Sequence, residues 1–114
     1  MHCLPGREEA TGRGVGTITL KTLGRLGRKP ALTTVAIQGF GNVGSHTAKF
    51  LGDATCKVVA VSDVSGGYYR AEGLDLPGLL RYALQNRGGL AGYQDAEHIT
   101  NEQLLELPVD VLIP

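Results

Sequence analysis

An excess of charge of either sign is missing from this sequence, and its absence excludes several classes of protein. The 114 residues carry 11 Lys or Arg against 11 Asp or Glu, which gives a formal net charge of zero. Without a basic excess there is no field to hold a nucleic-acid backbone or an anionic membrane surface. We therefore expect neither nucleic acid nor membrane among the partners.

Long apolar runs and a secretory signal are also missing. No run approaches the roughly 20 apolar residues that cross a bilayer. Residues 1–7 lack the charged head and the apolar body of a signal peptide. The resulting expectation is a cytoplasmic protein.

Cysteine and histidine are too few and too scattered to build a site by local spacing. The two cysteines are Cys3 and Cys56, and the three histidines are His2, His46 and His98. No CxxC pair and no zinc-ligand spacing occurs among them. We expect free thiols, no metal site and no Cys/His nucleophile pair.

Glycine, in contrast, is plentiful. There are 17 glycines in 114 residues, about twice the average usage. They fall between apolar runs, which predicts turns and close backbone approaches where a site can lie. With 42% hydrophobic and 19% charged residues, the composition supports one packed domain.

Alternating helical and strand patterns predict an α/β fold. Apolar residues at helical spacing predict helices in residues 15–27, 42–51, 76–84 and 101–107. Short β-branched, apolar runs predict strands in residues 33–38, 57–61 and 109–113. Strands separated by helices predict a Rossmann-like parallel sheet with flanking helices. Three main strands make an incomplete sheet, so a fragment or a truncated reading frame is expected.

Two of these helices have recognisable starts, and the chain has two expected parts. Asp75 is a good N-cap, with Pro77 in the first turn that follows. Thr100 and Gln103 form a capping box in the sequence. Residues 1–32 are expected to form a leading loop and helix, and residues 33–114 a truncated dinucleotide-binding domain.

One glycine motif carries the chemistry. It has the form GxGxxG and consists of Gly39, Phe40, Gly41, Asn42, Val43 and Gly44. Taken alone, the motif is weak in a chain so rich in glycine. Its context makes it more specific, because it directly follows a predicted strand and opens a predicted helix.

Each glycine of this motif has a physical role in dinucleotide binding. The first allows a tight turn, the second lets a pyrophosphate approach the backbone, and the third lets the helix pack closely on the strand. An acidic residue about 20 positions further on bonds the adenosine ribose, and Asp63 stands 19 residues after Gly44. The alternative is a plain glycine-rich turn with Asp63 as a loop cap.

Several segments in register resemble the glutamate dehydrogenase family. Residues 6–15 (GREEATGRGV) resemble the segment that leads into the family's coenzyme domain, and residues 35–45 (VAIQGFGNVGS) resemble its dinucleotide fingerprint. Residues 58–63, 66–67 and 73–75 follow in the same order and spacing, and residues 109–114 resemble the strand before the family's nicotinamide-contacting Asn. Leucine- and phenylalanine-type dehydrogenases share the architecture, and the insert after Asp63 favours the glutamate branch.

The resemblance implies roles for residues near the start of the chain. Thr11 would lie near the nicotinamide carboxamide, and Arg7 would reach toward a substrate carboxylate. The alternative for Arg7 and Arg13 is an ordinary solvated helix start.

The resemblance also implies roles in the coenzyme site. Asn42 and Val43, with the backbone from Gly41, would hold the pyrophosphate, and Asp63 would approach the adenosine ribose. A carboxylate there repels a 2′-phosphate and so favours NAD over NADP. The family uses such an Asp with either coenzyme, so the choice between them stays open.

The family's catalytic residues have no counterpart in this sequence. Neither its glycine-rich segment with the catalytic Lys nor the accompanying Asp is matched, and no Asn follows Pro114. The resemblance implies the NAD(P)-binding segment of a hexameric enzyme that deaminates L-glutamate oxidatively to 2-oxoglutarate and ammonia. We expect this chain to bind coenzyme without turnover. A stand-alone dinucleotide-binding module and a non-functional truncated reading frame are the alternatives.

Overall fold

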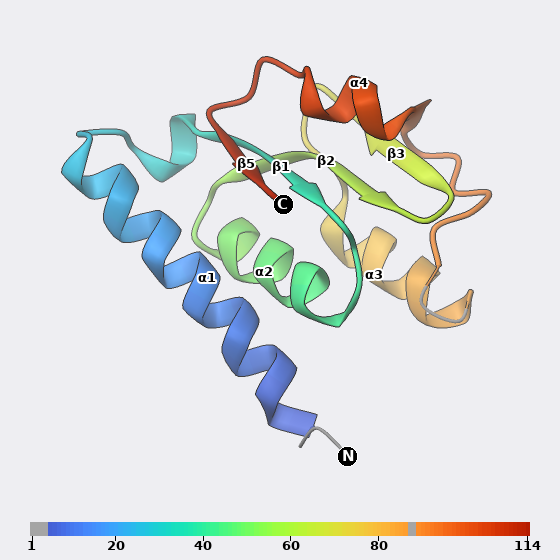
Figure 1. Cartoon of the computed structure of the whole chain (residues 1–114), viewed down its shortest axis with the longest axis horizontal. Coiled ribbons are helices and arrows are strands. Elements are labelled where there is room, and N and C mark those ends of the chain that lie inside the picture. The colour runs from blue at the N-terminus through green and yellow to red at the C-terminus, as the bar shows by residue number, and fades with distance from the viewer. Residues whose placement is uncertain (1–4, 87–88) are drawn as a thin grey trace.

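The computed structural model describes residues 5–86 and 89–114, and for residues 5–9 and 42 it describes the backbone alone. The helices are α1 (Pro5–Arg25), α2 (Asn42–Asp53), α3 (Leu76–Gln85) and α4 (Asn101–Leu105), with a 3₁₀ turn at Pro30–Leu32. The strands are β1 (Thr34–Gln38), β2 (Lys57–Asp63), β3 (Gly66–Tyr69), β4 (Glu97–Ile99) and β5 (Val111–Ile113). Figure 1 shows their arrangement.

The strands form one sheet in the order β4-β3-β2-β1-β5. The pairs β5–β1 and β1–β2 are parallel, whereas β2–β3 and β3–β4 are antiparallel. The predicted α/β class, with three parallel strands (β2, β1 and β5) and flanking helices, is therefore confirmed. The three main strands expected from the sequence are only part of the sheet, because β3 and β4 extend it. Their short segments, Gly-Gly-Tyr-Tyr and Glu-His-Ile, carry little of the alternation that marks a strand in a sequence.

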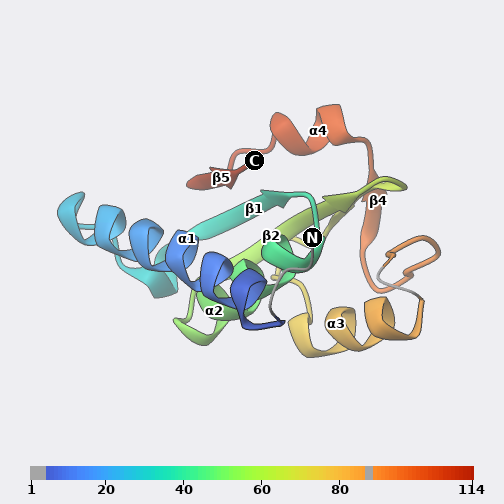
Figure 2. The ribbon, with the colours of Figure 1, turned by 60° about the horizontal axis from the view of Figure 1, so that its bottom comes forward.

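Helices cover both faces of the sheet. In Figure 2, α1, α2 and α3 lie below it and α4 lies above it. Val35 and Ile37 of β1 pack in the larger core, on the side of α1–α3, and Ala36 packs in the smaller core beneath α4. In β2, Val59 and Ala60 both belong to the smaller core. The pairing of β1 with β2 shifts register at this point, which explains two successive residues on one face.

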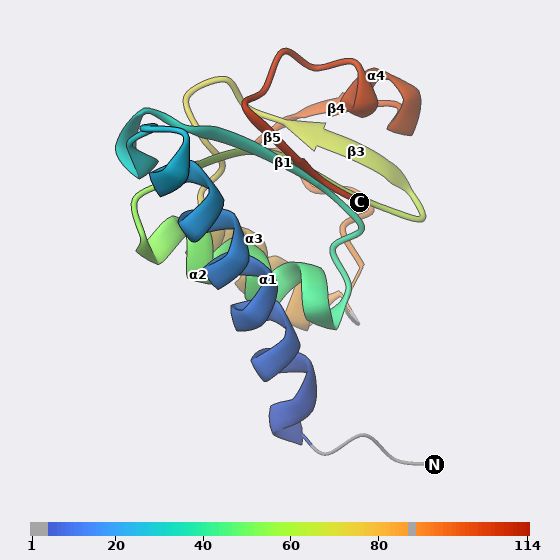
Figure 3. The same ribbon diagram turned by 60° about the vertical axis from the view of Figure 1, so that its left-hand side comes forward.

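Helix α1 begins ten residues before the apolar rhythm of the sequence indicates. Residues 5–14, expected as a loop, are helical from Pro5, a residue type that suits the first helical position. The helix runs diagonally across α2, and its N-terminal part extends beyond the sheet (Figures 1 and 3). Gly12 and Gly16 are buried on the α2 side, where a Cβ at Gly16 would overlap the Phe50 ring. Packing against α2, rather than helix propensity, stabilises this glycine-rich segment.

A matched pair of substitutions in α1 tests this packing. A Cβ at Gly12 would lie 2.6 Å from His46 Cβ and 3.0 Å from the Thr47 nitrogen of α2, whereas a Cβ at Gly14 meets nothing within 4 Å. We expect Gly12→Ala to lower the free energy of unfolding by about 1–2 kcal/mol, since overpacking outweighs the gain in helix propensity. Gly14→Ala should raise it by about 0.5–1 kcal/mol. Urea unfolding measures both, and equal effects would contradict close α1–α2 packing.

Both predicted helix caps are confirmed. The Asp75 side chain accepts a hydrogen bond from the N–H of Gly78 in the first turn of α3. At α4, Thr100 Oγ1 accepts from the Gln103 N–H at 3.0 Å, and Gln103 Oε1 accepts from the Thr100 N–H at 2.8 Å. The capping box thus fixes the point at which the chain turns back over the sheet.

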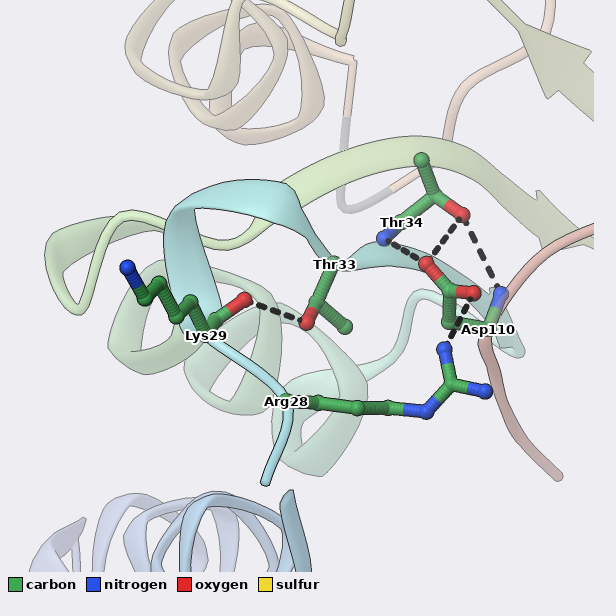
Figure 4. Close-up of polar contacts among 5 residues, drawn as sticks. All are labelled: Arg28, Lys29, Thr33, Thr34 and Asp110. Atoms are coloured by element: carbon green, nitrogen blue, oxygen red, sulfur yellow. Dashed lines mark hydrogen bonds and ion pairs between the residues drawn. The ribbon is translucent and has the colours of Figure 1, made fainter. Parts of the chain in front are cut away.

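Asp110 ties the start of β5 to the start of β1 (Figure 4). Its Oδ2 accepts from the Thr34 N–H at 2.9 Å, and its Oδ1 accepts from Arg28 Nη1 at 2.9 Å. The Thr34 N–H, helped by the Thr34 hydroxyl and the Arg28 guanidinium, lowers the pKa of this exposed carboxyl. A lowered folded-state pKa contributes stability that is present above the unfolded-state pKa and is lost as the pH falls through the folded-state value.

Candidate functional site

The turn between β1 and α2 is built on two glycines that touch each other. Gly39 has φ +97°, a left-handed conformation that glycine adopts without strain. Its N–H donates to Ser62 Oγ of β2 at 3.1 Å. A Cβ at Gly44 would overlap the Gly39 carbonyl oxygen and lie 3.1 Å from its carbonyl carbon. The first turn of α2 therefore packs directly on the tight turn, as the first and third motif positions require.

Gly41 differs from both neighbours because nothing in the fold demands a glycine there. It is the N-cap of α2, with φ −81° and ψ −159°, and a Cβ added to it meets nothing within 4 Å. Gly41 is exposed, at the end of the helix where first-turn N–H groups lack intrahelical partners. The backbone here is open to close approach by an anion.

Asp63 ends β2, beside this turn. Its Oδ1 accepts from the Ser65 N–H at 2.8 Å and from Ser65 Oγ at 2.5 Å. Its Oδ2 accepts from the Leu90 N–H at 2.7 Å. Tyr68 Oη lies 2.7 Å from Ser65 Oγ, and because that hydroxyl already donates to Asp63, Tyr68 is the donor. Three donors thus hold the half-buried carboxylate in one place.

A cavity of about 580 Å³ opens at the carboxyl ends of β1 and β2. Its described lining residues are Gln38, Gly39, Phe40, Gly41, Ser62, Asp63, Val64, Gly89 and Asn101. Ligands of open α/β sheets bind in such crevices, outside the carboxyl ends of the strands. The volume lies in the usual range of small-molecule and cofactor sites.

The structure brings some of the predicted site residues together and not others. Four of them, Gly39, Phe40, Gly41 and Asp63, line this cavity, although the Phe40 side chain is also part of the core. Gly44 lies beneath the turn. Val43 is 37% exposed in the first turn of α2.

The remaining predicted residues, Thr11, Arg7 and Asn42, lie on helices α1 and α2. Thr11 is exposed on α1, next to Gly12, which abuts the first turns of α2. The backbones of Arg7 and Asn42 are helical, and their side chains fall outside what the structure describes.

Sequence reasoning missed three contributors to the site. Ser62 is buried in β2 and receives the Gly39 N–H, Leu90 donates its backbone N–H to Asp63, and Asn101 reaches the cavity from α4. A serine in an otherwise apolar strand just before Asp63 was a usable signal. The other two depend on how distant segments fold back, and no local pattern marks them.

A second cavity, of about 530 Å³, lies among helices α1, α2 and α3 and shares Phe40 and Gly41 of the β1–α2 turn with the first cavity. Arg13 and Lys49 line this cavity together with apolar residues that include Phe50 and Leu80. Apart from the two shared residues its lining comes from the helices, whereas ligands of this class of sheet bind outside the carboxyl ends of the strands.

The described part of the chain has neither a cluster of metal ligands nor a membrane-spanning helix. No group of three or more His, Cys, Asp or Glu side chains is placed to hold a metal ion, and Cys56 is a buried free thiol. The other cysteine, Cys3, lies outside the described residues. No described helix is both long and apolar enough to cross a membrane.

The turn, the helix start and the strand-end carboxylate define a Rossmann-like α/β domain. The family model of the Glutamate/Leucine/Phenylalanine/Valine dehydrogenases matches residues 4–114. The chain belongs to this family. It is 50% identical to the glutamate dehydrogenase of Thermotoga maritima over 110 residues, which are 96% of this chain and 26% of that protein.

A solved structure agrees with this assignment. The hetero-hexameric glutamate dehydrogenase of Thermus thermophilus, in its leucine-bound form, superimposes with a TM-score of 0.79 at 30% identity, over 96% of this chain and 25% of that one. The chain thus spans about a quarter of the proteins it matches. A catabolic NAD-specific enzyme of Bacillus subtilis is 42% identical over 96% of this chain and 25% of that protein. An NADP-specific enzyme of Saccharolobus shibatae is 40% identical over 92% of this chain and 25% of that protein.

Proposed function

We propose that this chain is the NAD(P)-binding segment of a glutamate dehydrogenase. Residues 33–114 form the coenzyme-binding part, and residues 1–32 lead into it. The observation that carries the proposal is the juxtaposition of three features at one cavity: the Gly39 turn, the open N-terminus of α2, and the Asp63 carboxylate. Family membership and the match to solved glutamate dehydrogenases support it.

Charge at the start of α2 suits a pyrophosphate. A 12-residue helix has a partial positive charge at its N-terminus, and no acidic side chain in the first turn of α2 cancels it. Backbone N–H groups from Gly41 through Gly44 would face the phosphates. Asn42 and Val43 border this approach, and Thr11 would lie toward the nicotinamide half.

The adenosine ribose of the coenzyme would bind beside the Asp63 carboxylate. A fixed carboxylate accepts a hydrogen bond from a ribose hydroxyl and repels a 2′-phosphate, which favours NAD. Relatives with names specific for NAD and for NADP both occur at about 40% identity, so identity does not separate the two. The choice of NAD rests on Asp63.

The reaction of the whole enzyme would be the oxidative deamination of L-glutamate to 2-oxoglutarate and ammonia. The coenzyme, when bound, supplies the hydride acceptor. The described residues of this chain would bind and orient it, and Arg7 is the candidate for contact with a substrate carboxylate. No catalytic acid or base is assigned among these 114 residues. A hexameric assembly is part of the proposal, since the Thermus thermophilus relative is a hetero-hexamer.

Calorimetry tests the binding proposal. We expect NADH titrated into the chain to give a saturable heat. In Asp63→Ala the ratio of the NADPH dissociation constant to the NADH dissociation constant should move closer to one. This change follows because removal of the carboxylate removes both a ribose acceptor and a repulsion of the 2′-phosphate. A flat trace with folded wild-type chain would contradict coenzyme binding, and an unchanged ratio would contradict the ribose role of Asp63.

A further inference from the structure

A loop after α3 is tied to that helix by side chains. We call residues 89–93 the α3 loop. Tyr82 Oη donates to the Ala91 carbonyl at 2.5 Å. Asn86 Nδ2 donates to the Ala91 carbonyl at 3.2 Å and to the Gly89 carbonyl at 3.3 Å. Tyr82 of α3 and the C-cap residue Asn86 therefore hold the loop by its backbone oxygens.

The α3 loop in turn holds the strand-end carboxylate. Leu90 is fully buried, so core packing fixes the loop at its centre. Its N–H donates to Asp63 Oδ2 at 2.7 Å, while the N–H and the hydroxyl of Ser65 both donate to Oδ1. A carboxylate oxygen has about two acceptor positions. Oδ1 is therefore filled, and Oδ2 keeps one position on a cavity wall that Asp63 shares with Gly89.

A carboxylate held in this way distinguishes NAD from NADP more strongly than a mobile carboxylate would. Its remaining acceptor position is presented in advance to a single ribose hydroxyl, so no side-chain ordering is needed on binding. It also cannot turn away from a 2′-phosphate, so charge repulsion acts at full strength. The donors that fix Asp63 would thus contribute to coenzyme choice.

We propose that Tyr82 is a positioning residue for coenzyme choice, which acts through the α3 loop and the Leu90 N–H on Asp63. This inference rests on the proposed coenzyme site and adds to it a residue on α3 that does not line the cavity. Tyr82 is half-buried, with its ring edge-on to that of Tyr93 at 5.3 Å. Tyr82→Phe removes the hydroxyl and keeps the ring packing.

Calorimetric titration of NADH and of NADPH into three chains tests the inference. In Tyr82→Phe the dissociation constant for NADH should rise by about fivefold, and that for NADPH should stay the same or fall, so the ratio narrows. Tyr93→Phe is the matched control, because its ring lies in the same cluster and its hydroxyl makes no hydrogen bond among the described residues. It should leave both dissociation constants unchanged.

A double substitution separates positioning from general loosening of the fold. In an Asp63→Ala background, Tyr82→Phe should have no further effect on the ratio, since the carboxylate it positions is gone. Two results would overturn the role of Tyr82. One is an equal loss of affinity for NADH and NADPH in Tyr82→Phe. The other is the same change in the ratio of the two dissociation constants when Tyr82→Phe is made in the Asp63→Ala background. A folded wild-type chain that binds neither coenzyme would overturn the proposed function and this inference together. Wild-type binding with an unmoved ratio in Tyr82→Phe would overturn this inference alone.

Discussion

Gly44→Ala is expected to destabilise the domain by about 2–4 kcal/mol, because its Cβ would make the closest backbone contact of any described glycine. The new Cβ would overlap the carbonyl oxygen of Gly39, which is backbone and has no rotamer with which to move away. Helix α2 would have to shift off the end of β1, and the buried contacts of Thr47 and Leu51 would shift with it.

Thermal unfolding followed by circular dichroism measures this loss. For a domain of this size the melting temperature should fall by roughly 10–20 °C. Gly24→Ala is the matched control, because Gly24 is also helical and a Cβ there meets nothing within 4 Å. It should leave the melting temperature unchanged or raise it slightly. A Gly44→Ala chain as stable as wild type would show that α2 does not pack on the turn as described.

Gly41→Asp is expected to abolish coenzyme binding while the fold stays intact. Aspartate is a favoured N-cap, and the backbone of Gly41 is extended, so α2 should be as stable as before or more stable. The same carboxylate would stand where the pyrophosphate approaches the helix. Two negative groups about 4 Å apart near a protein surface repel by about 4 kcal/mol, so NADH affinity should fall at least 100-fold.

Gly41→Asn separates charge from bulk in this experiment. Asparagine has nearly the shape of aspartate and caps a helix equally well, but it carries no charge. Its NADH affinity should fall by roughly tenfold, between wild type and Gly41→Asp. Both variants need a melting temperature at or above that of wild type for the comparison to hold. Equal affinities in Gly41→Asp, Gly41→Asn and wild type would place the coenzyme somewhere else.

The parts of the site that sequence reasoning anticipated are those that depend on backbone sterics. Gly39 needs a positive φ and Gly44 has no room for a side chain. Few residue types other than glycine meet such demands, so the roles of Gly39 and Gly44 in the turn could be predicted from the sequence. Asp63 could also be predicted, because it ends a buried strand at a characteristic sequence distance from the glycine turn. These positions came together as expected, and their roles in binding remain predictions.

The features that sequence reasoning missed depend on tertiary packing. Every residue except proline has a backbone N–H, so nothing in the sequence marks the one at Leu90 as the donor to Asp63. Helix α1 extends back to Pro5 because Gly12 and Gly16 fit closely against α2, whereas a glycine-rich segment by itself predicts a loop. Strand β4 forms by pairing with the backbone N–H and C=O groups along the edge of β3, which no local sequence pattern indicates.

Backbone amide chemical shifts, followed by NMR during an NADH titration of the wild-type chain, test the central claim most directly. If the coenzyme binds across the β1–α2 turn, the largest shifts should fall on Gly41, Val43 and Gly44 and on Asp63 across the cavity. Amides that line the second cavity alone, such as those of Arg13 and Lys49, should shift little. Saturable shifts centred on Arg13 and Lys49 with none at Asp63, or no shifts in a folded chain, would contradict the dinucleotide site.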